Sequence, residues 1–160
     1  MCSASNKGNP EYAIRKVLSA SCDRLDKRDY EGFLALCGDQ FTYKITAYSP
    51  EIRREMIWLE KDRAGLGDLF KLLPAHNRDR RPITRHFSVF DVDFADDQRS
   101  ASVVSGVQVF RTESDGGVTS LAAVGKYMDE ISLEGEAPIL LSRELRLETR
   151  MLGMGFHEPL

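Results

Sequence analysis

The sequence predicts an α+β fold in which a curved, mostly antiparallel sheet wraps around N-terminal helices and forms a cone with a pocket. Three observations predict it. Apolar residues recur at helical spacing from Ile14 to Leu25. Four β-rich runs fill the chain after residue 82. The first of these runs changes its apolar phase part-way, as a bent strand would. Helices packed into the concave side of such a sheet give an α+β cone.

The N-terminal helices are predicted from their capping residues. Asn9 is a suitable cap and Pro10 suits the first turn, so the first helix is expected to begin at Pro10. A short second helix is expected from Tyr30 to about Cys37, with Asp29 as its cap and a glycine as its stop.

The middle of the chain mixes clear and ambiguous signals. The run 40–48 alternates as a strand, whereas 56–59 fits either a short buried strand or a helical turn. Residues 62–73 are expected to form a third helix that ends near Pro74, because proline interrupts helical hydrogen bonding.

Four strands are expected in the second half, and "SDGG" between the second and third predicts a tight hairpin. The phase change near 89–90 indicates either two covered faces or a β-bulge. In the last strand, Ile139, Leu141, Leu145 and Leu147 are expected to face the core. The expected strands are 83–95, 100–112, 118–131 and 139–151.

Length and composition indicate one globular domain. The chain has 160 residues, 42% of them hydrophobic, and a net charge of −3, which argues against a nucleic-acid partner. No apolar run reaches transmembrane length, and three cysteines form no disulfide framework, which favours the cytoplasm. We expect a flexible leader over 1–9, a single domain over 10–152 and an apolar tail over 153–160.

Metal sites find no support in the residue spacing. Zinc sites need clustered Cys and His, which this chain lacks. A site of two histidines and one carboxylate for iron can be drawn only with His76, His86 and a nearby Asp. The expectation is that this chain binds neither metal nor cofactor.

General acid–base catalysis is the enzymatic alternative. A cone could point Asp23, Tyr43 and His86 into one cavity, where they would support a dehydration or an isomerisation. The plainer interpretation makes Asp23 the edge of a buried helix face, Tyr43 a core residue and His86 a structural hydrogen-bonding residue. A small-molecule binding module that uses the same cavity also stays open.

Apolar residues outside the regular elements are candidates for subunit contact. The tail has no strand or helix in which to bury its side chains, so it would either fold back over its own domain or pack at a subunit interface, which we favour. Met and Phe are frequent at interfaces. Trp58 lies in the ambiguous middle segment, where core burial is the default and an interface anchor the alternative. The candidate interface residues are Trp58, Met151, Met154 and Phe156.

Several motifs resemble the small (beta) subunits of Rieske non-haem iron oxygenases, which have the nuclear-transport-factor-2-like (NTF2-like) fold. They are "LDKRDYEGFLALCGDQFTYKITAYSPE", "EMIWLEKDRAGL", "RPITRHFSVFDVDF" and "LLSRELRLETRML", and the resemblance spans roughly 11–152. Within the family, "ITAYSPEIRREMIWL" and "TRMLG" are most similar to the methanesulfonate monooxygenase hydroxylase.

The resemblance implies a division of labour between two subunits. The large (alpha) subunit would hold the Rieske 2Fe-2S cluster and the mononuclear iron. It would receive electrons from a ferredoxin and an NADH-dependent reductase. The chain itself would be non-catalytic, with a structural His86, and would assemble as three alpha and three beta subunits with beta–beta contacts. The substrate of the monooxygenase or dioxygenase would be an alkanesulfonate such as methanesulfonate, or an aromatic compound.

Overall fold

The computed structural model describes residues 8–76, 79–153 and 158–160. This described part of the chain contains three helices and six strands. The helices are α1 (Pro10–Asp26), α2 (Tyr30–Leu34) and α3 (Arg63–His76). The strands are β1 (Cys37–Ser49), β2 (Arg54–Asp62), β3 (Ile83–Phe94), β4 (Ser100–Thr112), β5 (Thr119–Ser132) and β6 (Ile139–Leu147).

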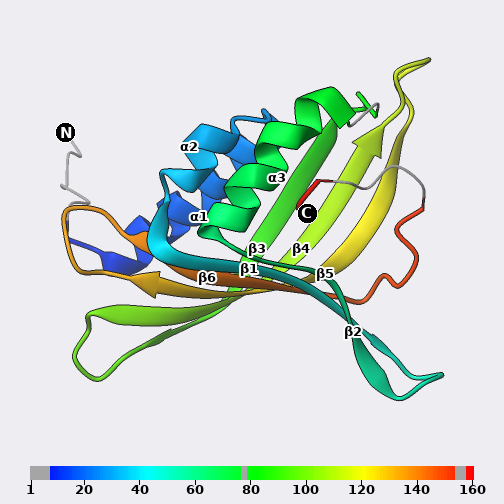
Figure 1. Cartoon of the computed structure of the whole chain (residues 1–160). Coiled ribbons are helices and arrows are strands. Elements are labelled where there is room, and N and C mark those ends of the chain that lie inside the picture. The colour runs from blue at the N-terminus through cyan, green and yellow to red at the C-terminus, as the bar shows by residue number, and fades with distance from the viewer. Residues whose placement is uncertain (1–7, 77–78, 154–157) are drawn as a thin grey trace, which may run out of the picture.

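The six strands form one sheet in the order β2-β1-β6-β5-β4-β3. All neighbours are antiparallel except β1 and β6, which run parallel. The sheet is strongly curved, and the three helices lie on one of its faces (Figure 1). The buried core fills the space between the helices and this face. The predicted α+β class with a curved, mostly antiparallel sheet is therefore confirmed.

The two N-terminal helices form where they were predicted, but the second is shorter. The Asn9 side chain accepts hydrogen bonds from the backbone N–H groups of Glu11 and Tyr12 at 3.0 and 3.4 Å, which confirms the predicted start at Pro10. The second helix is shorter than predicted. It ends at Leu34 because β1 already begins at Cys37, where the backbone pairs with β6.

The ambiguous segment forms β2, an edge strand whose side chains are mostly exposed. Of the two alternatives the strand is therefore correct, although it is not buried, and the helical turn is wrong. The ladder of β2 with β1 skips Trp58, since Leu59 pairs with Ile45 and Ile57 pairs with Thr46. Trp58 is thus the extra residue of a bulge. The third helix continues through Pro74 to His76 rather than ending before the proline.

The predicted bulge in the first long strand is confirmed at Phe90. Val89 pairs with Ser105 and Asp91 pairs with Val104, so Phe90 has no partner in the ladder. Its ring lies over Gly106 on the neighbouring strand, where an added Cβ would collide with it. The bulge bends β3 and contributes to the curvature of the sheet.

A bulge at Leu141 corrects the prediction for the last strand. Leu140 pairs with Ile131 and Ser142 pairs with Glu130, so Leu141 is an extra residue. The side chains before the bulge therefore reverse their faces: Leu140 is fully buried, whereas Leu141 and Ile139 are exposed. Leu145 and Leu147 face the core as predicted.

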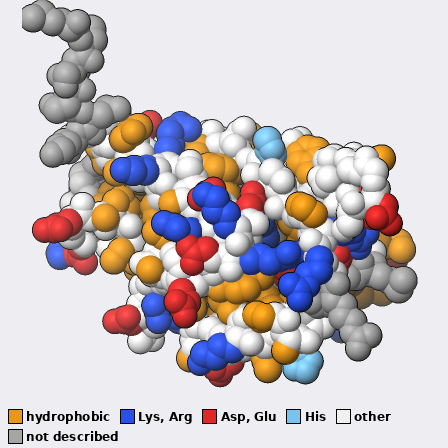
Figure 2. Space-filling view, turned by 90° about the horizontal axis from the view of Figure 1, so that it is seen from above, with side chains coloured by type: hydrophobic (Ala, Val, Ile, Leu, Met, Phe, Trp, Pro, Cys, Tyr) orange, Lys and Arg blue, Asp and Glu red, His pale blue; other side chains and the backbone are white. Residues whose placement is uncertain are grey.

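The helical side of the molecule carries charges of both signs. Figure 2 shows lysine and arginine side chains spread among acidic and hydrophobic ones over this face, with no continuous basic surface. In the part of the chain that the structure describes, none of the helices has the length and apolar character needed to cross a membrane.

Candidate functional site

The concave side of the sheet holds a buried cluster of charged and aromatic side chains. Arg143 on β6 donates to both carboxylate oxygens of Asp129 on β5, at 2.7 and 3.0 Å, and both side chains are excluded from solvent. The guanidinium lies 4.1 Å from the centre of the Tyr127 ring. Burial raises the pKa of Asp129, while Arg143 acts in the opposite direction.

A second, partly buried ion pair joins β3 to α1. Arg85 donates to Asp26 at 2.5 Å, and the Asp26 carboxylate also accepts from the backbone N–H of Arg85 at 3.1 Å. The Arg85 side chain is almost fully buried. Tyr43 on β1 lies in the same interior, and burial raises the pKa of its hydroxyl, so it is a hydrogen-bond donor at neutral pH.

The last described residues enter this interior. Glu158, Pro159 and Leu160 are buried, and Leu160 is completely inaccessible to solvent. Arg85 donates to the Pro159 carbonyl at 2.6 Å, and Tyr43 donates to the Leu160 carbonyl. These three residues lie inside their own domain, which is one of the two placements considered for the tail. Residues 154–157 lie outside the described part of the chain.

The proposed acid–base group does not assemble. Asp23 is half exposed on α1, where it pairs with Lys27 at 2.8 Å. His86 is exposed on the outer face of β3, and its ring meets the edge of the Phe110 ring at 5.5 Å. Of the three candidates, only Tyr43 points into the cone. The condition that this alternative required, a shared closed pocket, is not met.

Arg85 and Asp26 were not predicted as interior residues, although they lie close in sequence to His86 and Asp23, which were candidates. Arg85 precedes His86 and shares the inward phase of Ile83, which is also buried. Asp26 lies one helical turn after Asp23. A charged residue at an inward strand position is the signal that could have identified Arg85, because a buried charge requires a partner.

Metal-binding groups are absent from the described part of the chain: residues 8–76, 79–153 and 158–160 contain no cluster of three or more His, Cys, Asp or Glu side chains able to hold a metal ion. His76 is exposed at the end of α3 and His86 lies on the outer face of the sheet. Cys22 and Cys37 are free and buried, and burial raises the pKa of Cys37 to about 12.

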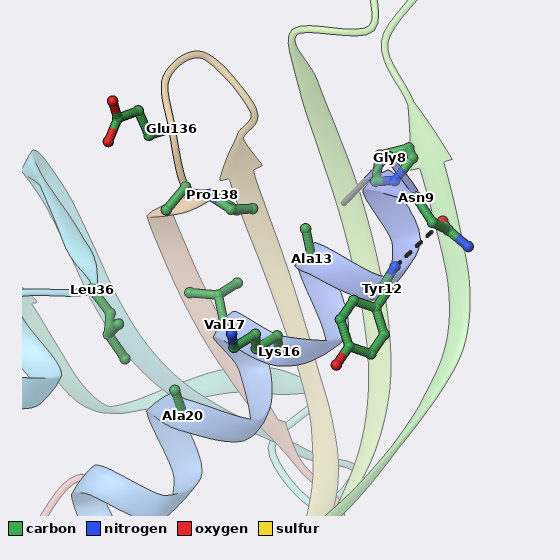
Figure 3. Close-up of a pocket in the computed structure, with 12 residues that line it drawn as sticks. Gly8, Asn9, Tyr12, Ala13, Lys16, Val17, Ala20, Leu36, Glu136 and Pro138 are labelled. Atoms are coloured by element: carbon green, nitrogen blue, oxygen red, sulfur yellow. Dashed lines mark hydrogen bonds between the residues drawn. The ribbon is translucent and has the colours of Figure 1, made fainter. Parts of the chain in front are cut away.

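A surface groove runs beside the first turns of α1 (Figure 3). It has a volume of about 610 Å³ and lies between this helix and the loop that joins β5 to β6. Its lining is mainly apolar, with Tyr12, Val17 and Pro138 among the contributors, and its charged residues are Lys16 and Glu136. None of the acid–base candidates Asp23, Tyr43 and His86 is among the lining residues.

Two of the four candidate interface residues are described, and both are exposed. Trp58 is 48% exposed at the β2 edge, and Met151 is 87% exposed after the last strand. Met154 and Phe156 lie outside the described residues.

Comparison with known proteins decides the family. Residues 21–154 match the family described as ring hydroxylating beta subunit. The chain belongs to this family of beta subunits. It is 40% identical over 155 residues to the methanesulfonate monooxygenase hydroxylase subunit beta of Methylosulfonomonas methylovora, which covers 92% of this chain and 86% of the relative.

Two further relatives extend the comparison of this beta subunit. The 2-aminobenzenesulfonate 2,3-dioxygenase subunit beta of an Alcaligenes species is 31% identical over 148 residues, covering 92% of this chain and 97% of the relative. A chain of naphthalene 1,2-dioxygenase has the same fold, with a TM-score of 0.74 and 16% identity over 98% of this chain and 89% of the other. The NTF2-like fold and the beta-subunit family that the motifs predicted are confirmed.

Proposed function

We propose that this chain is the non-catalytic beta subunit of a hydroxylase whose large alpha subunit carries a Rieske 2Fe-2S cluster and a mononuclear iron. The observation that carries the proposal is the match over residues 21–154 to beta subunits of ring-hydroxylating oxygenases. The described interior supports it, because Asp23 and His86 point away from the cone that holds Tyr43. On this proposal, substrate oxidation takes place on the alpha subunit.

We also infer that the substrate is a sulfonate. These two relatives are named for methanesulfonate and for 2-aminobenzenesulfonate, which share a sulfonate group although one is aliphatic and the other aromatic. The higher identity, 40% against 31%, favours a small alkanesulfonate such as methanesulfonate. Electrons would reach the alpha subunit from NADH through a reductase and a ferredoxin.

The assembly we propose contains three alpha and three beta subunits, with beta–beta contacts. Trp58 and Met151 are the described candidates for subunit contact because their apolar side chains are exposed on the single chain. Met154 and Phe156 belong to the same proposal on sequence grounds alone. Aromatic and methionine side chains are enriched at the centres of such interfaces.

Co-expression tests the proposal. The chain is produced with a Rieske-type alpha subunit encoded beside its gene, purified through a tag on the beta chain and analysed by light scattering. We expect the two subunits to co-elute with the mass of three pairs. With ferredoxin and reductase added, NADH consumption should depend on methanesulfonate more than on 2-aminobenzenesulfonate or benzoate. Substrate turnover by the beta chain alone, or elution without the alpha subunit, would contradict the proposal.

A further inference from the structure

The end of the described chain occupies the interior of the cone as a ligand would. Residues 158–160 lie between α3 and the sheet, far along the chain from the elements that surround them (Figure 1). The Leu160 side chain is completely buried. Pro159 and Leu160 present their carbonyl oxygens to Arg85 and Tyr43, which belong to two different strands. The segment thus places one apolar side chain and two hydrogen-bond acceptors in the interior of the cone.

Arg28, just before α2, and Tyr30, its first residue, also hold the segment through its one charged side chain, Glu158. Arg28 pairs with Glu158 at 3.0 Å, and the Tyr30 hydroxyl lies 3.3 Å from the other carboxylate oxygen. The same Arg28 donates to the backbone carbonyls of Asp79 and Arg81, at 3.3 Å each. Arg28 therefore fixes the segment to the loop that leads into β3.

Several polar atoms in the interior are buried without a hydrogen-bond partner. Among the described residues, the Arg85 Nε, the Tyr127 hydroxyl and the Ser105 hydroxyl are buried without a hydrogen-bond partner. Buried polar groups in native proteins are nearly always paired, so unpaired donors mark a place suited to a further acceptor. Tyr43 and Arg85 add two donors that are now used by the carbonyls of the bound segment.

We propose that the cone contains a latent small-molecule site that residues 158–160 close. Its ligands would carry a carbonyl or carboxylate oxygen, held by Arg85 and Tyr43, and a branched apolar end in the space that Leu160 fills. While the segment is bound, the site is inaccessible. This inference is independent of assembly with an alpha subunit, because it concerns the interior of a single chain.

Melting temperatures of three variants test whether the segment is seated. Leu160→Ala should lower the melting temperature by about 5–15 °C, because it leaves a cavity in the core. Met151→Ala removes an exposed side chain of similar size and should change it by less than about 2 °C. A variant lacking residues 158–160 should melt below the parent chain. Equal melting of the Leu160→Ala and Met151→Ala variants would overturn the proposal.

Binding of two probes tests the site itself. We use 4-methylpentanamide and 4-methylpentanoate, which share a carbonyl group and a branched end and differ in charge. Either probe should raise the melting temperature of the variant lacking 158–160, or restore its folding, and leave the parent unchanged. Adding Tyr43→Phe should weaken binding about fivefold, the effect of one lost hydrogen bond. If neither probe stabilises the shortened variant, or if both stabilise the parent equally, the latent site is ruled out.

Discussion

Arg143 and Asp129 face each other across neighbouring strands, with their Nε and Oδ1 atoms 2.7 Å apart and both side chains excluded from solvent. Removing one partner leaves the other charge buried and uncompensated. We expect Arg143→Met to lower the free energy of unfolding by about 3–5 kcal/mol. Urea denaturation at neutral pH measures the change.

The control is the double variant Asp129→Leu/Arg143→Met, which removes both charges. Because replacing a whole buried ion pair by apolar residues is often neutral, its stability should lie within about 2 kcal/mol of the parent chain. A double variant that is less stable than the single Arg143→Met variant would contradict this account. It would indicate that the packing of the guanidinium against Tyr127 outweighs the charge pairing.

Asp79 is predicted to contribute to stability in a defined pH window. Hydrogen bonds from Arg81 lower the pKa of its carboxyl from 3.8 to about 2. A carboxyl with a depressed folded-state pKa stabilises the protein above its unfolded pKa and loses that contribution as the pH falls. The parent chain should therefore lose stability between about pH 4 and pH 2 more steeply than Asp79→Asn does.

Urea midpoints at pH 5, 4, 3 and 2.5 measure the two slopes. Asp68→Asn serves as the matched control, because the Asp68 carboxylate is exposed on α3 and pairs only loosely with Lys71, at 3.5 Å. It should keep the slope of the parent. Parallel curves for the parent and Asp79→Asn would show that this carboxylate does not couple to folding in acid.

Two glycines of the sheet should differ sharply in their tolerance of alanine. A Cβ at Gly125 would lie 2.5 Å from the backbone oxygen of Arg146, so the strand would have to move. At Gly106 it would meet only the exposed ring of Phe90, which can rotate away. Gly125→Ala should cost about 2–3 kcal/mol and Gly106→Ala less than about 1 kcal/mol. Chemical denaturation compares them, and equal costs would refute the distinction.

Trp58 is expected to anchor the association with the alpha subunit. Trp58→Ala should weaken the complex about thirtyfold, or about 2 kcal/mol, and leave the melting temperature of the isolated chain almost unchanged. Leu72→Ala is the control, because Leu72 is exposed to a similar degree on α3, away from the β2 edge. Surface plasmon resonance with the alpha subunit measures both. Similar affinities for the two variants would remove Trp58 from the interface.

The bulges at Phe90 and Leu141 show why one feature of the sheet could be predicted and the other could not. Near Phe90 the apolar side chains change phase, and this change is visible in the sequence. At Leu141 the apolar residues keep their spacing on both sides of the bulge, so the reversal of faces leaves no trace in the pattern. Only the pairing with β5 reveals it.

The interior could be predicted only in part for a similar reason. Tyr43 fits the alternation of its strand, and it is buried as that alternation requires. Arg85 and Asp26 are polar residues of a kind that usually face solvent, and their burial depends on each other and on the segment near Leu160. These contacts connect three parts of the chain that are far apart in sequence, and a local sequence pattern carries no information about such contacts.

The parallel pairing of β1 with β6 has a consequence for how the protein is made. Neither strand lies at an edge of the sheet, yet one is synthesised early and the other close to the end. On the ribosome, the edge of β1 that pairs with β6 has no partner until β6 has been synthesised. Folding that depends on such distant pairing is slow, and an unpaired strand is prone to aggregation. The yield of this subunit should therefore respond to the speed of translation and to the supply of chaperones.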